Sequence, residues 1–328
     1  MLIQCLAIFL SAFFLGLLFI SLLRRPLLKL KTSPGTGIPL IGGTAIILAF
    51  ALTSWAVLYG QGRLSREAIG IMVASGLMLL FGIADDWLEL SVLAKISVQA
   101  VAACLLIALG VRTQIVYIGD IANAAITLVW VIGITNAFNH LDIIDGLAGG
   151  AALIAGLAFC LIAFMNRDAH TALLALSLSG AVFSFLLYNL PPARIYMGNA
   201  GSHALGFTLA AIALVISYAP LERKVALLSP LFILGLPIFD TAFLILMRLS
   251  HGRSIFRKSN DHFALRFIKQ GRSRKNTLLW ILGLAAFFAF CGISLSRTSN
   301  LQGISIIISA VALSLFLAHR MSKVSVDA

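Results

Sequence analysis

The chain has 328 residues, of which 60% are hydrophobic and only 11% are charged. Soluble domains carry about 25% charged residues, so this composition, with a mean hydropathy of +1.03, excludes a water-soluble globular enzyme. The apolar content also excludes a disordered chain. The formal net charge of +12 comes from basic residues in loops between apolar runs, which favours membrane topology and anionic lipid over nucleic acid. The sequence therefore predicts a polytopic membrane protein.

Eleven apolar stretches come close to the roughly 20 residues that a helix needs to cross a bilayer. They do not alternate polar and apolar residues as barrel strands do, so we predict an all-α membrane bundle of about 11 helices. Ten is the alternative, because only a few polar residues separate two of the stretches. The first stretch lacks a basic n-region and a small-residue cleavage site, and is expected to be a retained span. The predicted spans are 1–23, 40–59, 68–84, 93–110, 121–138, 147–165, 171–188, 203–219, 225–247, 277–296 and 301–319.

The basic residues indicate the orientation of this bundle. With the N-terminus outside, 17 of the 24 Lys and Arg residues fall on one side, which the positive-inside rule makes cytoplasmic. The segment 248–276 holds nine of them and is long enough for a short amphipathic helix or hairpin. We expect one membrane domain over 1–328, with cytoplasmic active-site loops at 24–39, 85–92, 139–146, 189–202 and 248–276.

Acidic residues gather on the same predicted face, although carboxylates near a bilayer are costly and usually functional. Asp85 and Asp86 are adjacent at the end of an apolar stretch, and two such carboxylates repel each other unless a cation is near. Mg²⁺ would supply that charge and keep waters for a substrate phosphate. The alternative is that these acids are simply solvated at a helix end.

A second polar set lies in the sequence NAFNHLDIIDGLAGG. Its members are Asn136, Asn139, Asp142 and Asp145, at successive spacings of three. On a helix these side chains would share one face. A polar helix end with a glycine cap would account for one or two of them but not readily for all.

The sequence NLPPARIYMGNAGSHALGF places small residues ahead of an apolar run. Gly198, Asn199, Gly201 and Ser202 follow a Pro-Pro turn, and backbone N–H groups at a helix N-terminus favour an anion. An ordinary helix cap explains the same composition equally well.

Two further features carry charge. Asp240 lies inside a predicted span, where a buried carboxylate needs a partner, a metal or a proton; a structural hydrogen bond is the alternative. His262 follows Asp261 in a basic segment suited to a phosphate or diphosphate, although such a segment can also bind anionic lipid only. The surrounding basic residues are Arg253, Arg257, Lys258 and Arg266.

In this order the segments resemble the polyprenyl-phosphate N-acetylhexosamine-1-phosphate transferase family. The matches are Gly42-Gly43, DDWLELSVLAKISVQ, NAFNHLDIIDGLAGG, NLPPARIYMGNAGS, PIFDT and the basic loop with His262. Eleven spans look more like its O-antigen-initiating branch than its ten-span peptidoglycan branch. The resemblance implies transfer of a HexNAc-1-phosphate from a UDP-sugar to undecaprenyl phosphate with release of UMP, at the cytoplasmic face of a bacterial inner membrane.

The resemblance also implies a cofactor and partners. The cofactor is Mg²⁺, with Mn²⁺ as an alternative. The partners are undecaprenyl phosphate, a UDP-HexNAc and the lipid bilayer, with no nucleic acid; a homodimer is one oligomeric alternative.

By the same resemblance, five residues are catalytic. Asp85 and Asp86 would handle the lipid phosphate and the metal, one of them acting as base. Asp142 and Asp145 would help hold the nucleotide and diphosphate, and His262 would face the diphosphate or the sugar. The implied metal ligands are Asp86, Asn199 and Asp240. The implied substrate contacts are Lys95, Asn136, Asn139, Asn189, Gly198, Ser202, Arg253, Arg257 and Arg266.

Two positions depart from the family pattern. Asn199 stands where most members have an aspartate in MGDxGS, and a multi-histidine stretch is reduced to His262 followed by Phe263 and Ala264. These departures leave open a weak or inactive paralogue that binds lipid phosphate or UDP-sugar without turnover. A transporter is the alternative from another class, but it should place its ionisable groups near the bilayer midplane.

Overall fold

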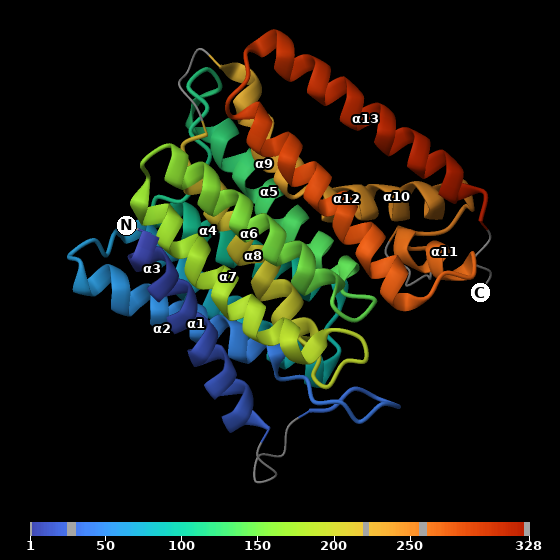
Figure 1. The fold of residues 1–328 in the computed structure, drawn as a ribbon, viewed down its shortest axis with the longest axis horizontal. Coiled ribbons are helices and arrows are strands. Elements are labelled where there is room, and N and C mark those ends of the chain that lie inside the picture. The colour runs from blue at the N-terminus through green and yellow to red at the C-terminus, as the bar shows by residue number, and fades with distance from the viewer. Residues whose placement is uncertain (1, 25–30, 219–222, 256–260, 325–328) are drawn as a thin grey trace.

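The chain forms a bundle of helices, seen in a computed structural model that describes residues 2–24, 31–218, 223–255 and 261–324 (Figure 1). These residues contain no β-strand and only two isolated bridges, which confirms the predicted all-α membrane class. The elements are α1 (Leu2–Leu23), α2 (Gly42–Gly60), α3 (Arg66–Leu88), α4 (Val92–Ala108), α5 (Gly119–Leu141), α6 (Leu147–Met165), α7 (Ala169–Asn189), α8 (Gly198–Val215), the 3₁₀ turn η1 (Lys224–Leu228), α9 (Ser229–Ile233), α10 (Gly235–Ser250), α11 (Phe263–Lys269), α12 (Arg274–Leu295) and α13 (Asn300–Ser322).

Each of the eleven predicted stretches contains a helix, but not all are simple spans. Nine helices among the described residues are long and apolar enough to cross a membrane, and α4 is shorter at 17 residues. The stretch predicted as one helix over 225–247 is broken, because η1 and α9 meet α10 at an angle of 72°. Pro237 explains the break: it has no N–H to bond the Ile233 carbonyl, and its ring would clash there if α9 continued. The chain is a multi-pass membrane protein.

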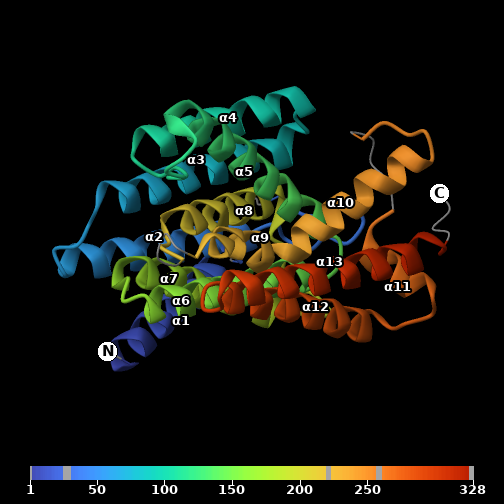
Figure 2. The same ribbon diagram turned by 90° about the horizontal axis from the view of Figure 1, so that it is seen from above.

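Helix α8 lies at the centre of the bundle, in contact with α2, α3, α5, α6 and α7 (Figure 2). Glycines allow this crowding. A Cβ added at Gly43 would lie 2.2 Å from the Cα of Gly201, and one added at Gly82 would lie 2.4 Å from the Cα of Ala200. Helices in lipid associate through such close van der Waals contact. The start of α8 is therefore held against both α2 and α3.

The peripheral elements complete the structure. Helix α13 runs along the outside of the bundle beside α12 (Figure 1). Only 11% of the residues in its apolar stretch are buried. The short helix expected within 248–276 is α11, which packs between α10, α12 and α13. Phe263 and Phe267 bury the inner face of α11.

We predict that the contact between α3 and α8 cannot accept a methyl group. Gly82→Ala should lower the free energy of unfolding by about 2 kcal/mol, because overpacking a close helix contact forces the backbones apart. Gly76→Ala is the matched control in the same helix, since a Cβ there meets nothing within 4 Å. Thermal unfolding of both variants in detergent measures the difference; equal melting temperatures would contradict the packing described.

Candidate active site

A polar cleft of about 1420 Å³ lies where the ends of α3, α5 and α10 meet the start of α8. Its lining combines carboxylates and amides from α3, α5 and α8 with imidazoles and guanidiniums from α5, α10 and the segment that follows α10. The residues come from segments more than a hundred positions apart, which the fold brings to one end of the bundle. The polar and charged lining includes Asp85, Asp86, Lys95, Asn136, Asn139, His140, Asn199, Arg248, Arg253 and His262.

The carboxylate of Asp86 sits on the N-terminus of α8. Its Oδ1 accepts a hydrogen bond from the backbone N–H of Asn199 at 2.8 Å, and its Oδ2 accepts one from that of Ala200 at 3.1 Å. Gly198 has φ 69°, and a Cβ there would lie 2.7 Å from Asp86 Oδ2. Helix N-termini attract anions. The sequence suggested that the first amides of α8 could bind a substrate anion. In the structure two of them donate to the carboxylate of Asp86.

Asp85, the neighbour of Asp86 in sequence, is completely buried. Its Oδ1 accepts a hydrogen bond from the backbone N–H of Leu90 at 2.9 Å, and its Oδ2 pairs with Lys95 Nζ at 2.6 Å. Glu89, with φ 49°, reverses the chain so that Leu90 N–H can reach back. The repulsion expected between the two adjacent carboxylates is thus relieved within the chain, by Lys95 for one and by α8 for the other.

The polar set near 140 does not share one helix face, because α5 ends at Leu141. Asn136 lies on α5 and exchanges hydrogen bonds with Gln99, at 2.7 and 3.3 Å. Asn139 donates to Asn199 Oδ1 at 3.1 Å and to Ser202 Oγ at 2.9 Å. The helix is followed by a turn that closes at Gly146, where φ is 80°. The acids belong to this turn.

Those acids, Asp142 and Asp145, differ in their surroundings. Asp145 Oδ2 accepts a hydrogen bond from the backbone N–H of Ala193 at 3.1 Å, which joins this turn to the loop before α8. Burial, and then the like charges of Asp145 and Asp86, raise the pKa of Asp142 to about 7. Asp142 is therefore the carboxyl of this turn that holds a proton near neutral pH.

His262, which lies between α10 and α11, is the centre of another part of the cleft. Its Nδ1 donates to Asp240 Oδ2 at 3.1 Å, and the backbone N–H of Phe263 donates to Asp240 Oδ1 at 3.0 Å. The ring of His140, from the last turn of α5, lies 6.3 Å from the His262 ring between centroids. Asp240 thus orients His262 from behind, with both of its oxygens engaged.

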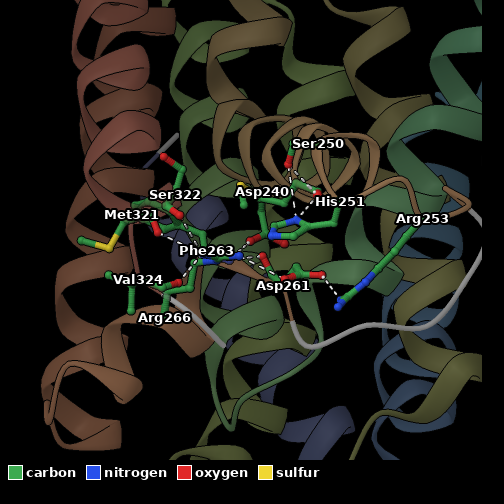
Figure 3. A network of polar contacts seen from close by, with 11 residues as sticks. Asp240, Ser250, His251, Arg253, Asp261, Phe263, Arg266, Met321, Ser322 and Val324 are labelled. Carbon is green, nitrogen blue, oxygen red and sulfur yellow. Dashed lines mark hydrogen bonds and ion pairs between the residues drawn. The ribbon is translucent and has the colours of Figure 1, made fainter. Parts of the chain in front are cut away.

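Asp261 joins the cleft to the end of the last helix (Figure 3). It pairs with Arg253 at 3.4 Å and with Arg266 at 3.0 Å. Arg266 is buried and also donates to the carbonyl groups of Met321, Ser322 and Val324, at the C-terminus of α13. Burial lowers the pKa of the Arg266 guanidinium, and Asp261 acts against this shift.

The comparisons with known proteins point to one family. Residues 68–217 match the model of glycosyl transferase family 4. The chain is 30% identical over 276 residues to a probable undecaprenyl-phosphate N-acetylglucosaminyl 1-phosphate transferase of Bacillus subtilis, covering 80% of this chain and 74% of that protein. The chain belongs to glycosyl transferase family 4.

Two other relatives fit the same assignment. The chain is 30% identical over 312 residues to the decaprenyl-phosphate N-acetylglucosaminephosphotransferase of Mycolicibacterium smegmatis, covering 83% of this chain and 77% of that protein. It is 27% identical over 267 residues to the phospho-N-acetylmuramoyl-pentapeptide-transferase of Lactobacillus johnsonii, covering 76% and 82%. The polar cleft of this family 4 member is formed largely within the matched segment.

The structure brings part of the predicted set to the cleft and leaves part behind it. Eight predicted residues line the cleft: Asp85, Asp86, Lys95, Asn136, Asn139, Asn199, Arg253 and His262. Arg257 lies outside the described residues. Seven others are not among the lining residues: Asp142, Asp145, Asn189, Gly198, Ser202, Asp240 and Arg266.

Several of these seven hold the site together. The Asn189 side chain accepts from Gly146 N–H and donates to the Ile195 carbonyl, both at 2.9 Å, so it ties two site loops together. Asp240 supports His262. Arg266 caps α13, so its placement does not support the expected contact with substrate. Each of these polar side chains can be buried because it forms hydrogen bonds with backbone groups or with another side chain of the site.

The sequence interpretation missed His140, Gln99 and Arg248. His140 stands between Asn139 and Asp142 in the motif itself, so its position was a usable signal. Gln99 was noted only as part of a match, and its partner on α5 could not be inferred from spacing. Arg248 ends α10 at the cleft and donates to the carbonyl of Ile255.

We predict unequal roles for the two arginines on Asp261. Arg266→Met should lower the free energy of unfolding by about 3 kcal/mol or more, because it leaves the end of α13 without its donor and the buried Asp261 with only the longer Arg253 contact. Arg253→Met removes the other partner, whose side chain is 38% exposed, and should change stability by less than about 1 kcal/mol. Thermal unfolding of both variants tests this, and an equal loss would refute the difference in role.

The raised pKa of Asp142 predicts a pH-dependent stability. Because the folded-state pKa is above its ordinary value of 3.8, the proton on Asp142 favours the folded state at low pH, and this contribution is lost as the pH rises from about 4 through about 7. Asp142→Asn should therefore raise the melting temperature relative to wild type at pH 8, with a smaller difference at pH 5. Unfolding in detergent with a chelator measures this; a difference independent of pH would show that Asp142 does not titrate as described.

Proposed function

We propose that this family 4 transferase moves a HexNAc-1-phosphate from a UDP-sugar to undecaprenyl phosphate, giving a polyprenyl-diphosphate sugar and UMP. An oxygen of the lipid phosphate attacks the phosphorus that bears the sugar, and the bond from that phosphorus to the UMP oxygen breaks. The observation that carries the proposal is that carboxylates and amides line one membrane-protein cleft together with imidazoles and guanidiniums. The names of the relatives support the same reaction class.

A cleft lined by these groups suits phosphoryl transfer, which needs positioning and charge stabilisation more than covalent chemistry. Lys95 on α4 and Arg253 after α10 both line the cleft and supply positive charge. His262, oriented by Asp240, faces the cleft beside His140, so two imidazoles are available to the phosphate oxygens or to the leaving UMP. Asp85, with its charge balanced by Lys95, is the carboxylate suited to act on the lipid phosphate. Asp142 and Asp145 shape the adjoining turn for the nucleotide.

The oxygen ligands fit a Mg²⁺ ion that arrives with a diphosphate. No group of three or more His, Cys, Asp and Glu side chains that could hold a metal exists among the described residues, and Asp240 does not line the cleft. Asp86 and Asn199 remain, a carboxylate and an amide oxygen side by side. Mg²⁺ commonly takes one or two protein oxygens and completes its shell with waters and phosphates, and Mn²⁺ accepts the same donors. Bound there, the ion would neutralise charge on the diphosphate.

The cleft location agrees with a reaction between a lipid and a soluble nucleotide. We propose that this end of the bundle faces the cytoplasm of a bacterial inner membrane, as the distribution of Lys and Arg predicts, and that the product starts an O-antigen-like envelope polysaccharide. The charged residues that line the cleft lie near the ends of α3 and α10 and the start of α4, not midway along a span, which argues against a transporter.

The proposal is tested by UMP release from purified detergent-solubilised protein, with undecaprenyl phosphate, Mg²⁺ and a panel of UDP-HexNAc donors. Turnover with one donor is the expected result, and chelation should abolish it. Asp86→Asn should reduce kcat/KM by about 10³-fold, since it removes a charge from the site and an acceptor from α8. Glu67→Gln, at an acid in the first turn of α3 and so at the other end of that helix, is the control and should retain most activity.

The assay also separates the alternatives. Protein that binds undecaprenyl phosphate or UDP-sugar but releases no UMP with every donor would be the inactive paralogue that Asn199 leaves open. Full turnover of Asp86→Asn would remove that residue from the proposed site.

A further inference from the structure

His203 is an unexplained polar residue next to the cleft. It lies on α8, one turn after Asn199, and is fully buried. Neither ring nitrogen has a hydrogen-bond partner, and the ring centroid lies 5.9 Å from that of Phe81 in a tilted arrangement. Buried polar groups are nearly always bonded, because leaving one unpaired is costly. A buried histidine with two unpaired nitrogens therefore calls for a second arrangement in which it has a partner.

The acceptor for such an arrangement is Asp85. His203 Nε2 lies 3.9 Å from Asp85 Oδ2, just beyond hydrogen-bond distance. The same oxygen is held by Lys95 Nζ at 2.6 Å. One carboxylate oxygen thus faces two donors, of which only one is engaged. A shift of about 1 Å would bring Nε2 into hydrogen-bond range.

Of the three groups, Lys95 is the one free to move. Its side chain is 25% exposed and lines the cleft, whereas the side chains of Asp85 and His203 are at most 1% exposed. If Lys95 turns toward an anion in the cleft, Asp85 loses its charged partner while remaining buried. A buried carboxylate without a partner costs several kcal/mol, which would hold Lys95 in place unless another donor replaced it.

We propose that His203 is a positioning residue that donates its Nε2–H to Asp85 Oδ2 when Lys95 leaves to bind a phosphate group in the cleft. The exchange needs no proton transfer, because a neutral imidazole with its proton on Nε2 is already a donor. Lys95 can then alternate between Asp85 and the substrate phosphate. This inference rests on the proposed function for the identity of the phosphate, but not for the exchange of partners on Asp85.

The sharpest test compares two amide variants that differ in reach. In His203→Gln the amide nitrogen takes the place of Nε2, and in His203→Asn it takes the place of Nδ1, which points away from Asp85. His203→Leu removes the donor altogether. We expect His203→Gln to retain at least half of the wild-type kcat/KM for UMP release, and His203→Asn and His203→Leu to lose about 10-fold. In a Lys95→Ala background the loss from His203→Asn should shrink to less than about 2-fold, because no exchange remains.

A second readout needs no turnover. Labelling of Lys95 by a small amine-reactive reagent, quantified by mass spectrometry on the ligand-free protein, reports how tightly Asp85 holds it. Labelling should be slower in His203→Asn and His203→Leu than in wild type, and near wild type in His203→Gln. Equal rates in all four proteins, or equal kcat/KM for the Gln and Asn variants, would overturn the proposal. If wild type releases no UMP while the labelling rates differ as expected, the proposed function fails and the exchange stands.

Discussion

The carboxylate of Asp86 on the first amides of α8 is the contact on which the site depends. It joins the end of α3 to the start of α8 at the place where Gly82 and Ala200 bring the two helices together. A helix start aimed at the cleft would otherwise offer its partial positive charge to solvent or to any anion. The Asp86 contact fixes the position of Asn199 at the start of α8. The side chain of Asn139 on α5 then donates a hydrogen bond to that of Asn199. Three helices are thereby set in register around one carboxylate.

Pairing of each carboxylate with donors from the chain explains how a membrane protein tolerates so many acids at one end. Asp85, Asp240 and Asp261 are buried, and each accepts from at least two donors supplied by other parts of the chain. The partners of Asp240 lie 22 and 23 positions away, whereas those of Asp85 and Asp261 lie 5 to 10 positions away, in the adjoining loop or the start of the next helix. The acids therefore order the loops as well as charging the cleft. A substrate phosphate would meet groups already oriented by their neighbours, which lowers the reorganisation required on binding.

Composition and apolar run length were enough to predict the fold, because a bilayer allows little besides helices. The predicted spans agree with the helices to within a few residues at most ends. The sequence misled in two places. The spacing of three suggested a shared helix face for Asp142 and Asp145, although both follow the end of α5 at Leu141, and the apolar run length made one helix of 225–247 despite Pro237. For the site, the motif acids predicted the position of the cleft, and eight of the predicted residues line it. Burial of Arg266 and the partners of Asn189 and Asp240 could not be predicted, since they depend on which loops meet in space.

Arg266 links the C-terminus of α13 to Asp261, and so to the site. Helix α13 is covered by protein over little of its length, yet the carbonyl groups at its C-terminus hold a guanidinium that also holds Asp261, the neighbour of His262 in sequence. The outermost helix is thus anchored by a residue next to the site. Shortening the protein from its C-terminus as far as Met321, a common step in preparing membrane proteins for study, would strip that guanidinium of its carbonyl partners and loosen the loop that carries the cleft histidine.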